Sequence, residues 1–152
     1  LTTGTLLSSF TFPSEYAGKL KYGVPTEKSV TTQGNNTYPP GQCTWYVCNR
    51  LIETGISTNS AIYNFNGNGH DWVNSLVARG WKKVTEPQVG AVMSIKGGYR
   101  GTPVEYGHVA FVEAVNKDGT FLISECNIGG VQNKPHYAVL TNQSYYSFAI
   151  PQ

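Results

Sequence analysis

The sequence predicts an α+β fold, in which helices from the first half of the chain pack on one side of a curved antiparallel sheet from the second half. Apolar residues recur at helical spacing in two segments, 42–53 and 70–78. After residue 87 the pattern changes to apolar runs separated by turn residues. The 152 residues are enough for a domain with a sizeable core. We expect strands at 91–96, 107–115, 120–127, 137–140 and 145–150.

The composition argues against several classes of function. The net charge is only +2 and there is no run of Lys or Arg, so we expect no nucleic-acid partner. No apolar run approaches the roughly 20 residues that span a bilayer, so we expect no membrane span in this chain. There is no paired Cys-x-x-Cys, no His-Glu-x-x-His and no glycine-rich phosphate loop. We therefore expect no cofactor and no structural zinc.

Residues 1–37 combine loop-forming residues with aromatic side chains such as Phe10, Phe12 and Tyr16. We expect an N-terminal arm or linker that is partly packed on a main domain at 38–152, with a short helix near 14–21 capped by Ser14. A tether to an upstream domain is the alternative. The start of the chain lacks a signal peptide and an initiator Met, which predicts a piece of a longer protein or a processed form. We expect the domain itself to be monomeric.

The helix predicted at 42–53 places a cysteine in its first turn. Pro39, Pro40 and Gly41 lead into Cys43, and Gly55 ends the apolar pattern. Unpaired backbone N–H groups and the positive end of the helix dipole favour a thiolate there. The alternative is that Cys43 is simply a small buried hydrophobic residue.

A hairpin in the second half predicts partners for this cysteine. His108 begins the apolar run at 107–115, and turn residues at 116–119 lead into the next strand. Pairing the two strands about this turn puts Asn127 opposite His108, and Glu125 opposite Ala110 as a diagonal neighbour of the histidine. Glu125 and Asn127 share one face of their strand, so either can reach the imidazole.

These residue types are those of a thiol hydrolase. Cysteine catalysis needs a base within hydrogen-bond reach and a third group that orients the base. We predict a site of Cys43, His108, Glu125 and Asn127. Each residue also has an ordinary structural explanation, such as a hydrogen-bonded histidine at a strand end or a solvated glutamate. The backbone N–H of Cys43 and the side-chain amide of Gln42 are candidate oxyanion donors, and Tyr106 is a candidate wall of a substrate groove.

Five segments occur in an order and spacing that resemble the CHAP domains, which are cysteine, histidine-dependent amidohydrolases/peptidases. Together they span about 39–151. In chain order they are Gly41-Gln42-Cys43-Thr44-Trp45-Tyr46-Val47 with Asn49-Arg50, His70-Asp71-Trp72, Pro87-Gln88-Val89-Gly90-Ala91-Val92, Tyr106-Gly107-His108-Val109-Ala110 and Ser124-Glu125-Cys126-Asn127.

The resemblance implies a papain-like fold and hydrolysis of an amide bond in bacterial peptidoglycan, by an N-acetylmuramoyl-L-alanine amidase or a peptide endopeptidase. It implies that Cys43 is the nucleophile, His108 the base and then the acid, and Glu125 the orienting carboxylate. Asn127 would support either the imidazole or the substrate. We expect an extracellular or wall-facing protein, whether secreted, virion-associated or phage-released. The alternatives are a non-catalytic wall-binding module and an amidase for a small peptide-like substrate.

The sequence departs from the family in two respects. Some CHAP enzymes carry an aspartate-rich calcium loop before the cysteine, but residues 34–40 contain no Asp, so we expect no metal site there. Cys48 and Cys126 lie outside the motifs, and we expect both to be buried and inert, with a disulfide between them as the alternative. His70 and His136 lie in polar segments and are expected to be solvated.

Overall fold

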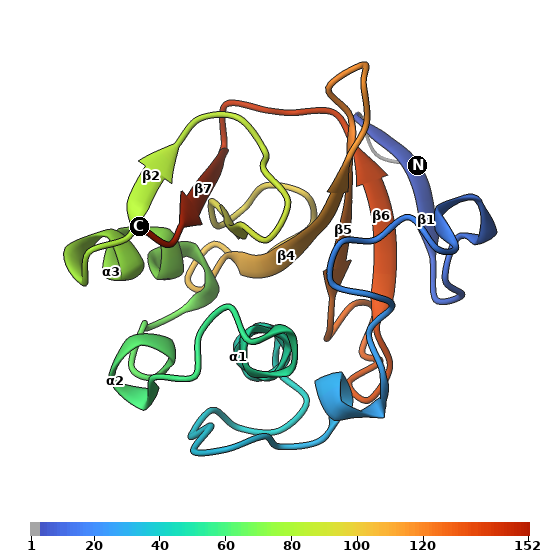
Figure 1. The fold of residues 1–152 in the computed structure, drawn as a ribbon. Helices are drawn as coiled ribbons and strands as arrows, with labels where there is room; N and C mark the ends of the chain where they lie inside the picture. Colours follow the sequence, from blue (N-terminus) through green and yellow to red (C-terminus); the bar gives the residue numbers. More distant parts are fainter. Residues whose placement is uncertain (1–3) are drawn as a thin grey trace.

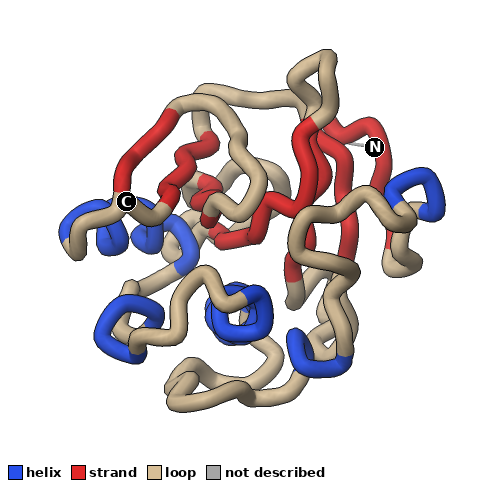
Figure 2. Tube along the Cα trace, viewed as in Figure 1, coloured by secondary structure: helices blue, strands red, loops and turns tan. Residues whose placement is uncertain are grey.

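The computed structural model describes residues 4–152, and its α-helices lie along one side of a curved sheet (Figure 1; Figure 2). The α+β prediction is confirmed. The elements, in chain order, are β1 (Thr5–Ser9), η1 (Ser14–Tyr16), η2 (Glu27–Val30), α1 (Cys43–Thr54), α2 (Ser60–Tyr63), η3 (Gly69–Asp71), α3 (Trp72–Ala78), β2 (Lys82–Val84), β3 (Val92–Ile95), β4 (His108–Val115), β5 (Phe121–Glu125), β6 (His136–Leu140) and β7 (Tyr146–Ile150).

The seven described strands form one antiparallel sheet in the order β1-β6-β5-β4-β3-β7-β2. Strands β3 to β6 form the predicted meander, and β7 returns to pair with β3 on its other side. The two edge strands, β1 and β2, were not predicted. Both are short, and each pairs with a strand far away in the sequence, so no local hairpin pattern marks them.

The predicted pairing of β4 with β5 is correct over the part nearest the candidate site. Phe111 pairs with Ser124 and Val112 with Ile123, which is the predicted register. The register then shifts by one residue at Glu113. Strand β5 ends at Glu125, so Asn127 lies beyond the paired region.

The helix predicted at 42–53 is α1, and its buried face forms the core with α3 and the sheet. Trp45, Val47 and Leu51 of α1 belong to one apolar cluster with Trp72 of α3 and Phe111 of β4. Cys48 and Cys126 are fully buried, and all three cysteines are free thiols. The alternative of a Cys48–Cys126 disulfide is therefore wrong.

A buried ion pair also joins α1 to the sheet. The Arg50 guanidinium donates from Nε and Nη2 to the Glu113 carboxylate at 2.9 and 2.8 Å, and Ser124 Oγ donates to the same carboxylate at 2.7 Å. Arg50 and Glu113 are both about 1% exposed. This contact fixes the helix that begins at Cys43 against the two strands that carry His108 and Glu125.

The described residues of the N-terminal segment lie against the rest of the chain; residues 1–3 of the expected arm lie outside the described range. Strand β1 pairs with β6. The helix expected at 14–21 is only the short turn η1, with Pro13 rather than Ser14 as its cap. Further along, Asn36 donates to the Asn49 side chain of α1 at 2.9 Å. None of the described helices is long and apolar enough to cross a membrane.

Candidate active site

A cleft of about 600 Å³ opens at the start of α1, and the Cys43 thiol lies on its wall. Gln42 is the N-cap residue and has an extended backbone, so Cys43 is the first residue of the helix. Gly41, at φ +89°, turns the chain into this position. The cleft is lined, among the described residues, by uncharged side chains and backbone apart from the candidate cysteine and histidine. They are Tyr38, Pro39, Gln42, Cys43, Thr44, Gly67, Asn68, Gly69, Gly101, Pro103, Tyr106, Gly107, His108 and Asn127.

His108 is the first residue of β4, is 6% exposed and faces the same cleft. Glycines on both sides make this placement possible. Gly107 has φ +58°, and a Cβ there would lie 2.4 Å from the His70 Cβ. A Cβ on Gly69 would lie 2.5 Å from the backbone carbon of His108. Only glycine lets η3 approach the start of β4 this closely, which explains the Gly-His step in the sequence.

The Cys43 thiol and the His108 imidazole shift each other's ionisation. Burial raises the pKa of Cys43, but the charge and hydrogen bond of His108, with backbone hydrogen bonds from Val109 and Thr44, outweigh it and bring the pKa below that of an ordinary thiol. Burial lowers the pKa of His108, but Cys43 and Glu125 together raise it to about 10. The two shifts favour a thiolate–imidazolium pair.

Glu125 orients the imidazole from the opposite side. His108 Nε2 donates to Glu125 Oε1 at 2.8 Å, which leaves Nδ1 for the thiol. Glu125 is fully buried at the end of β5. The prediction that a carboxylate or amide from the next strand reaches His108 therefore holds for Glu125.

Asn127 is placed differently from the prediction. It follows β5 with φ +63°, and its Nδ2 donates to Gln42 Oε1 at 3.2 Å. Both residues line the cleft, whereas the hydrogen bond to the imidazole comes from Glu125. The chain leaves the extended conformation after Glu125, so the strand pairing used for the prediction does not continue to Asn127.

Two further residues bind the Glu125 carboxylate. Arg100 forms a bidentate ion pair with it, Nη1 to Oε1 at 2.7 Å and Nη2 to Oε2 at 2.9 Å. His136 Nδ1 donates to Oε2 at 2.8 Å. Burial raises the pKa of Glu125, but the Arg100 charge and the hydrogen bonds from His108, His136 and Arg100 hold it well below its usual range.

These two contacts correct the sequence analysis. His136 was expected to be solvated but is 3% exposed, because it begins β6 beside the end of β5. Arg100 was not predicted as a partner of Glu125, and its only local signal is the glycine-rich loop in which it lies. Tyr106 is 54% exposed at the cleft, consistent with its expected position at the groove, and His70 remains partly exposed.

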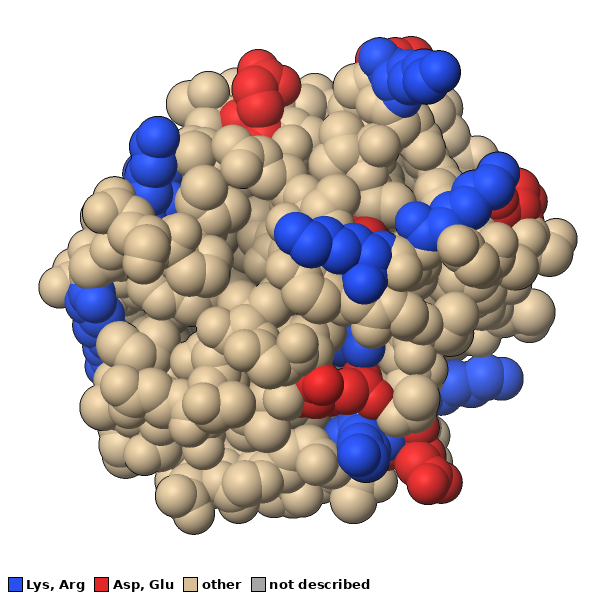
Figure 3. Space-filling model, viewed as in Figure 1, with Lys and Arg blue, Asp and Glu red and all other residues tan. Residues whose placement is uncertain are grey.

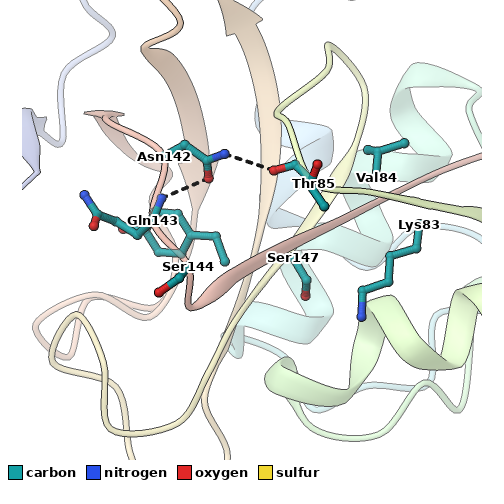
Figure 4. Close-up of a pocket in the computed structure, with 8 residues that line it drawn as sticks. Lys83, Val84, Thr85, Asn142, Gln143, Ser144 and Ser147 are labelled. Carbon is teal, nitrogen blue, oxygen red and sulfur yellow. Dashed lines mark hydrogen bonds between the residues drawn. The ribbon is translucent and has the colours of Figure 1, made fainter.

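A second hollow lies between the end of β2 and the segment that leads into β7 (Figure 4). Asn142 there donates to the backbone oxygen of Thr85 at 2.9 Å. Its described lining contains Lys83 but no pair of nucleophile and base. On the face in Figure 3, acidic and basic side chains are interspersed. Among residues 4–152, no group of three or more His, Cys, Asp or Glu residues is arranged to hold a metal ion.

Comparisons with known proteins place the chain in a family. Residues 33–127 match the model of the CHAP domain family. An N-acetylmuramoyl-L-alanine amidase domain-containing protein of Staphylococcus aureus is 42% identical over 94 residues, which are 62% of this chain and 14% of that protein. The N-acetylmuramoyl-L-alanine amidase sle1 of Staphylococcus epidermidis is 41% identical over 99 residues, 65% of this chain and 28% of that protein.

Staphylococcal secretory antigen SsaA of Staphylococcus aureus is 38% identical over 63% of this chain and 32% of its own length. A crystal structure of an N-acetylmuramoyl-L-alanine amidase from Staphylococcus aureus superposes with a TM-score of 0.65 at 33% identity, covering 76% of this chain and 31% of that one. The chain thus spans less than a third of the length of these relatives. By its sequence match and its fold, this chain belongs to the CHAP domain family.

Proposed function

We propose that this chain is a peptidoglycan hydrolase that cleaves an amide bond of the cell-wall peptide by a Cys–His–Glu thiol mechanism. One observation carries the proposal. A thiol with a lowered pKa lies in an open cleft beside an imidazole whose other nitrogen is bound to a buried carboxylate. The names of the related amidases support the substrate class.

The proposed reaction has two stages. The Cys43 thiolate attacks the carbonyl carbon of the amide, and the C=O electron pair moves onto oxygen. When the tetrahedral intermediate collapses, the C–N bond breaks and His108 gives its Nδ1 proton to the leaving amine. Water then attacks the thioester while His108 takes up its proton. The C–S bond breaks, which releases a carboxylic acid and restores the thiolate–imidazolium pair.

Stabilisation of the developing oxyanion is assigned to the backbone N–H of Cys43 and the side-chain amide of Gln42. The Cys43 N–H lies at a helix N-terminus, where backbone donors lack intrahelical partners. Asn127 binds Gln42 through its Oε1, so the two Nε2 hydrogens of Gln42 remain available for the substrate. In this proposal Asn127 acts through Gln42 and not through the imidazole.

The cleft also supports an uncharged peptide or sugar–peptide substrate. Its described walls carry Tyr38 and Pro39 on the side of α1, and Pro103 and Tyr106 on the loop before β4. We assign the catalytic domain to residues 38–152. Because peptidoglycan lies outside the cell membrane, the proposed reaction places the protein in an extracellular or wall-facing location, and one relative is named a secretory antigen.

Mass spectrometry of the soluble products from purified Gram-positive peptidoglycan tests the proposal. Peptides with a free L-Ala amino end would identify an amidase, and new ends within the stem or cross-bridge would identify an endopeptidase. Either result supports the proposed function. Protein that pellets with the wall and releases no products would contradict it and would indicate a binding module.

A further inference from the structure

The Glu125 carboxylate has more partners than a carboxylate that only orients a histidine requires. His108 occupies one position on Oε1. The Arg100 fork binds both oxygens, and His136 binds Oε2. Four N–H donors therefore surround a side chain that is fully buried. Together they leave the carboxylate little freedom to rotate or to accept a proton.

Arg100 reaches Glu125 only because of an unusual backbone conformation. It lies in the loop between β3 and β4 with φ +53°, a region in which glycine or asparagine is more common than a long side chain. Its side chain is nevertheless only 10% exposed, and its Nη1 lies 2.7 Å from Glu125 Oε1. Backbone outliers of this kind cluster at functional sites, where surrounding contacts maintain them.

The loop that carries Arg100 also forms part of the cleft. Gly101, Pro103 and Tyr106 line the cleft from this loop. The Arg100–Glu125 ion pair therefore attaches one wall of the cleft to the group that orients His108. Movement of this loop away from the sheet would remove two donors from Glu125 and open the cleft at the same time.

His136 is itself held in place from a distant part of the sequence. Its Nε2 lies 2.8 Å from Ser8 Oγ on β1, and Phe10 packs edge-on against its ring with centroids 4.8 Å apart. With Nδ1 donating to Glu125, this contact fixes the orientation of the ring. The series Ser8, His136, Glu125, His108 and Cys43 thus runs from the edge of the sheet to the cleft.

We propose that Arg100 and His136 are positioning residues that hold Glu125 ionised and in one orientation, so that His108 presents Nδ1 to Cys43. This rests on the proposed Cys–His–Glu mechanism, but its effect on the thiol needs no substrate. Other ionisable groups beside the network are Cys126, next to Glu125, Tyr145 and Tyr146, near Arg100, and His70 of η3, which packs against Gly107 beside His108. The Cys126 thiol has a pKa raised to about 12 by burial and will not titrate in the range of the test.

The test is the rate of Cys43 alkylation by iodoacetamide as a function of pH, followed by peptide mass mapping. Arg100→Gln removes the ion pair, while Lys96→Gln removes an exposed positive charge from the start of the same loop. We expect Arg100→Gln to raise the midpoint of thiolate formation by about one pH unit or more and Lys96→Gln to leave it unchanged. An unchanged midpoint in a folded Arg100→Gln protein would overturn the proposal for Arg100.

Arg100→Lys covers the case in which Arg100→Gln fails to fold. It keeps the charge but loses the bidentate fork, so its midpoint should lie between those of wild type and a full loss. A folded Arg100→Lys protein with the wild-type midpoint and wild-type turnover would overturn the role of the bidentate fork and leave only the positive charge of the side chain acting on Glu125.

For His136 the matched pair is His136→Leu and His136→Asn. The asparagine amide can replace the Nδ1 donor, whereas leucine cannot. We expect His136→Leu to raise the midpoint of Cys43 thiolate formation and His136→Asn to raise it less. Equal midpoints in the two variants would show that His136 contributes only packing. If the midpoints shift as expected but wild type releases no wall products, the proposed substrate is wrong and the positioning roles stand.

Discussion

At the scale of single residues, the proposed chemistry depends on the mutual ionisation of Cys43 and His108. Each raises the population of the charged form of the other, and Glu125 supports the imidazolium from behind. Because the charged forms depend on each other, the two groups titrate as a pair. This arrangement favours the thiolate–imidazolium pair that the proposed mechanism requires.

The pH dependence of kcat/KM should therefore be bell-shaped. The acidic limb reports protonation of the Cys43 thiolate, and the alkaline limb should lie near pH 10, where His108 loses its proton. Initial rates of wall solubilisation in buffers of constant ionic strength provide the measurement. Activity that rises steadily between about pH 8 and 10 would contradict the ion pair, because it would report an ordinary thiol with a pKa of about 8.5.

Two substitutions of Asn127 test the proposal that it acts through Gln42 and not through the imidazole. If Asn127 holds Gln42 Oε1, then Asn127→Asp loses its donor and attracts Gln42 Nε2 away from the cleft. We expect both Asn127→Asp and Asn127→Ala to lower kcat by about tenfold relative to wild type. Gln42→Ala, which removes the proposed oxyanion donor itself, should lower kcat by about 10²-fold or more. If Asn127→Asp keeps full activity while Asn127→Ala loses it, the residue supports the imidazole instead.

The predicted position of Cys43 at a helix start and of Glu125 within hydrogen-bond reach of His108 agrees with the structure, because a helix start and one hairpin determine these positions. It did not predict Arg100 or His136 as partners of Glu125. Arg100 turns toward the sheet through a left-handed backbone conformation, which the residue type disfavours. His136 follows a polar loop, and its burial depends on the β5–β6 pairing and on β1.

At the scale of elements, the position of Cys43 depends on how α1 is fixed to the sheet. The Arg50–Glu113 pair joins the middle of α1 to the bulge in β4, on the same two strands that carry the candidate site. Both side chains are buried. Arg50 Nη1 also pairs with Glu53 Oε1 at 2.6 Å, so loss of Glu113 removes one of the two carboxylates that neutralise a buried guanidinium. Neither residue's role was predicted, because the contact joins positions 63 residues apart.

Glu113→Ala should accordingly destabilise the fold strongly. We expect a loss of about 3 kcal/mol in the free energy of unfolding, because Arg50 Nε and Nη2 and Ser124 Oγ would all lose their buried acceptor and only Glu53 would still neutralise the guanidinium. Urea unfolding followed by tryptophan fluorescence measures this change. The matched control is Glu15→Ala at an exposed position, which should stay within about 0.5 kcal/mol of wild type. Equal, small effects would show that the ion pair does not stabilise α1 on the sheet.

At the scale of the whole molecule, the site couples its ionisation to folding. The pKa of His108 is raised in the folded chain, so its contribution to stability is complete below about pH 6.5 and is lost as the pH rises to about 10. The pKa of Cys43 is lowered, so its contribution is complete only above about pH 8.5. As the pH rises toward about 8.5, the loss of the His108 contribution to stability opposes the gain of the Cys43 contribution.

The predicted result is a contribution of the pair that declines between about pH 8.5 and 10, where only the loss of the His108 contribution remains. Buried tyrosines with raised pKa values, such as Tyr38 and Tyr146 at about 12, also destabilise the fold at high pH, so wild type must be compared with a variant that keeps them. This variant is the double substitution Cys43→Ala/His108→Gln, because burial would raise the pKa of a Cys43 left without His108. The difference in unfolding free energy between the two proteins should shrink between about pH 8.5 and 10. A difference that is constant over this range would exclude a folded-state pKa near 10.

Local sequence patterns predict most of the architecture, but they do not predict the two edge strands of the sheet. Helical spacing and hairpin turns predict α1, α3 and the meander from β3 to β6. Strands β1 and β2 pair with β6 and β7, which follow them by many residues, and their short sequences lack alternation. The same edge strand β1 brings Ser8 to His136, so a contact with the candidate site was missed together with the strand.

The most direct test of the account is the release of soluble fragments from purified peptidoglycan by wild type, Cys43→Ala and Cys126→Ala. Cys126 is a buried thiol close to the site, so its replacement controls for loss of a cysteine without loss of the cleft thiol. We predict that Cys43→Ala binds the wall but releases no fragments above background, while Cys126→Ala retains activity. Release by Cys43→Ala at the wild-type rate would contradict the thiol mechanism.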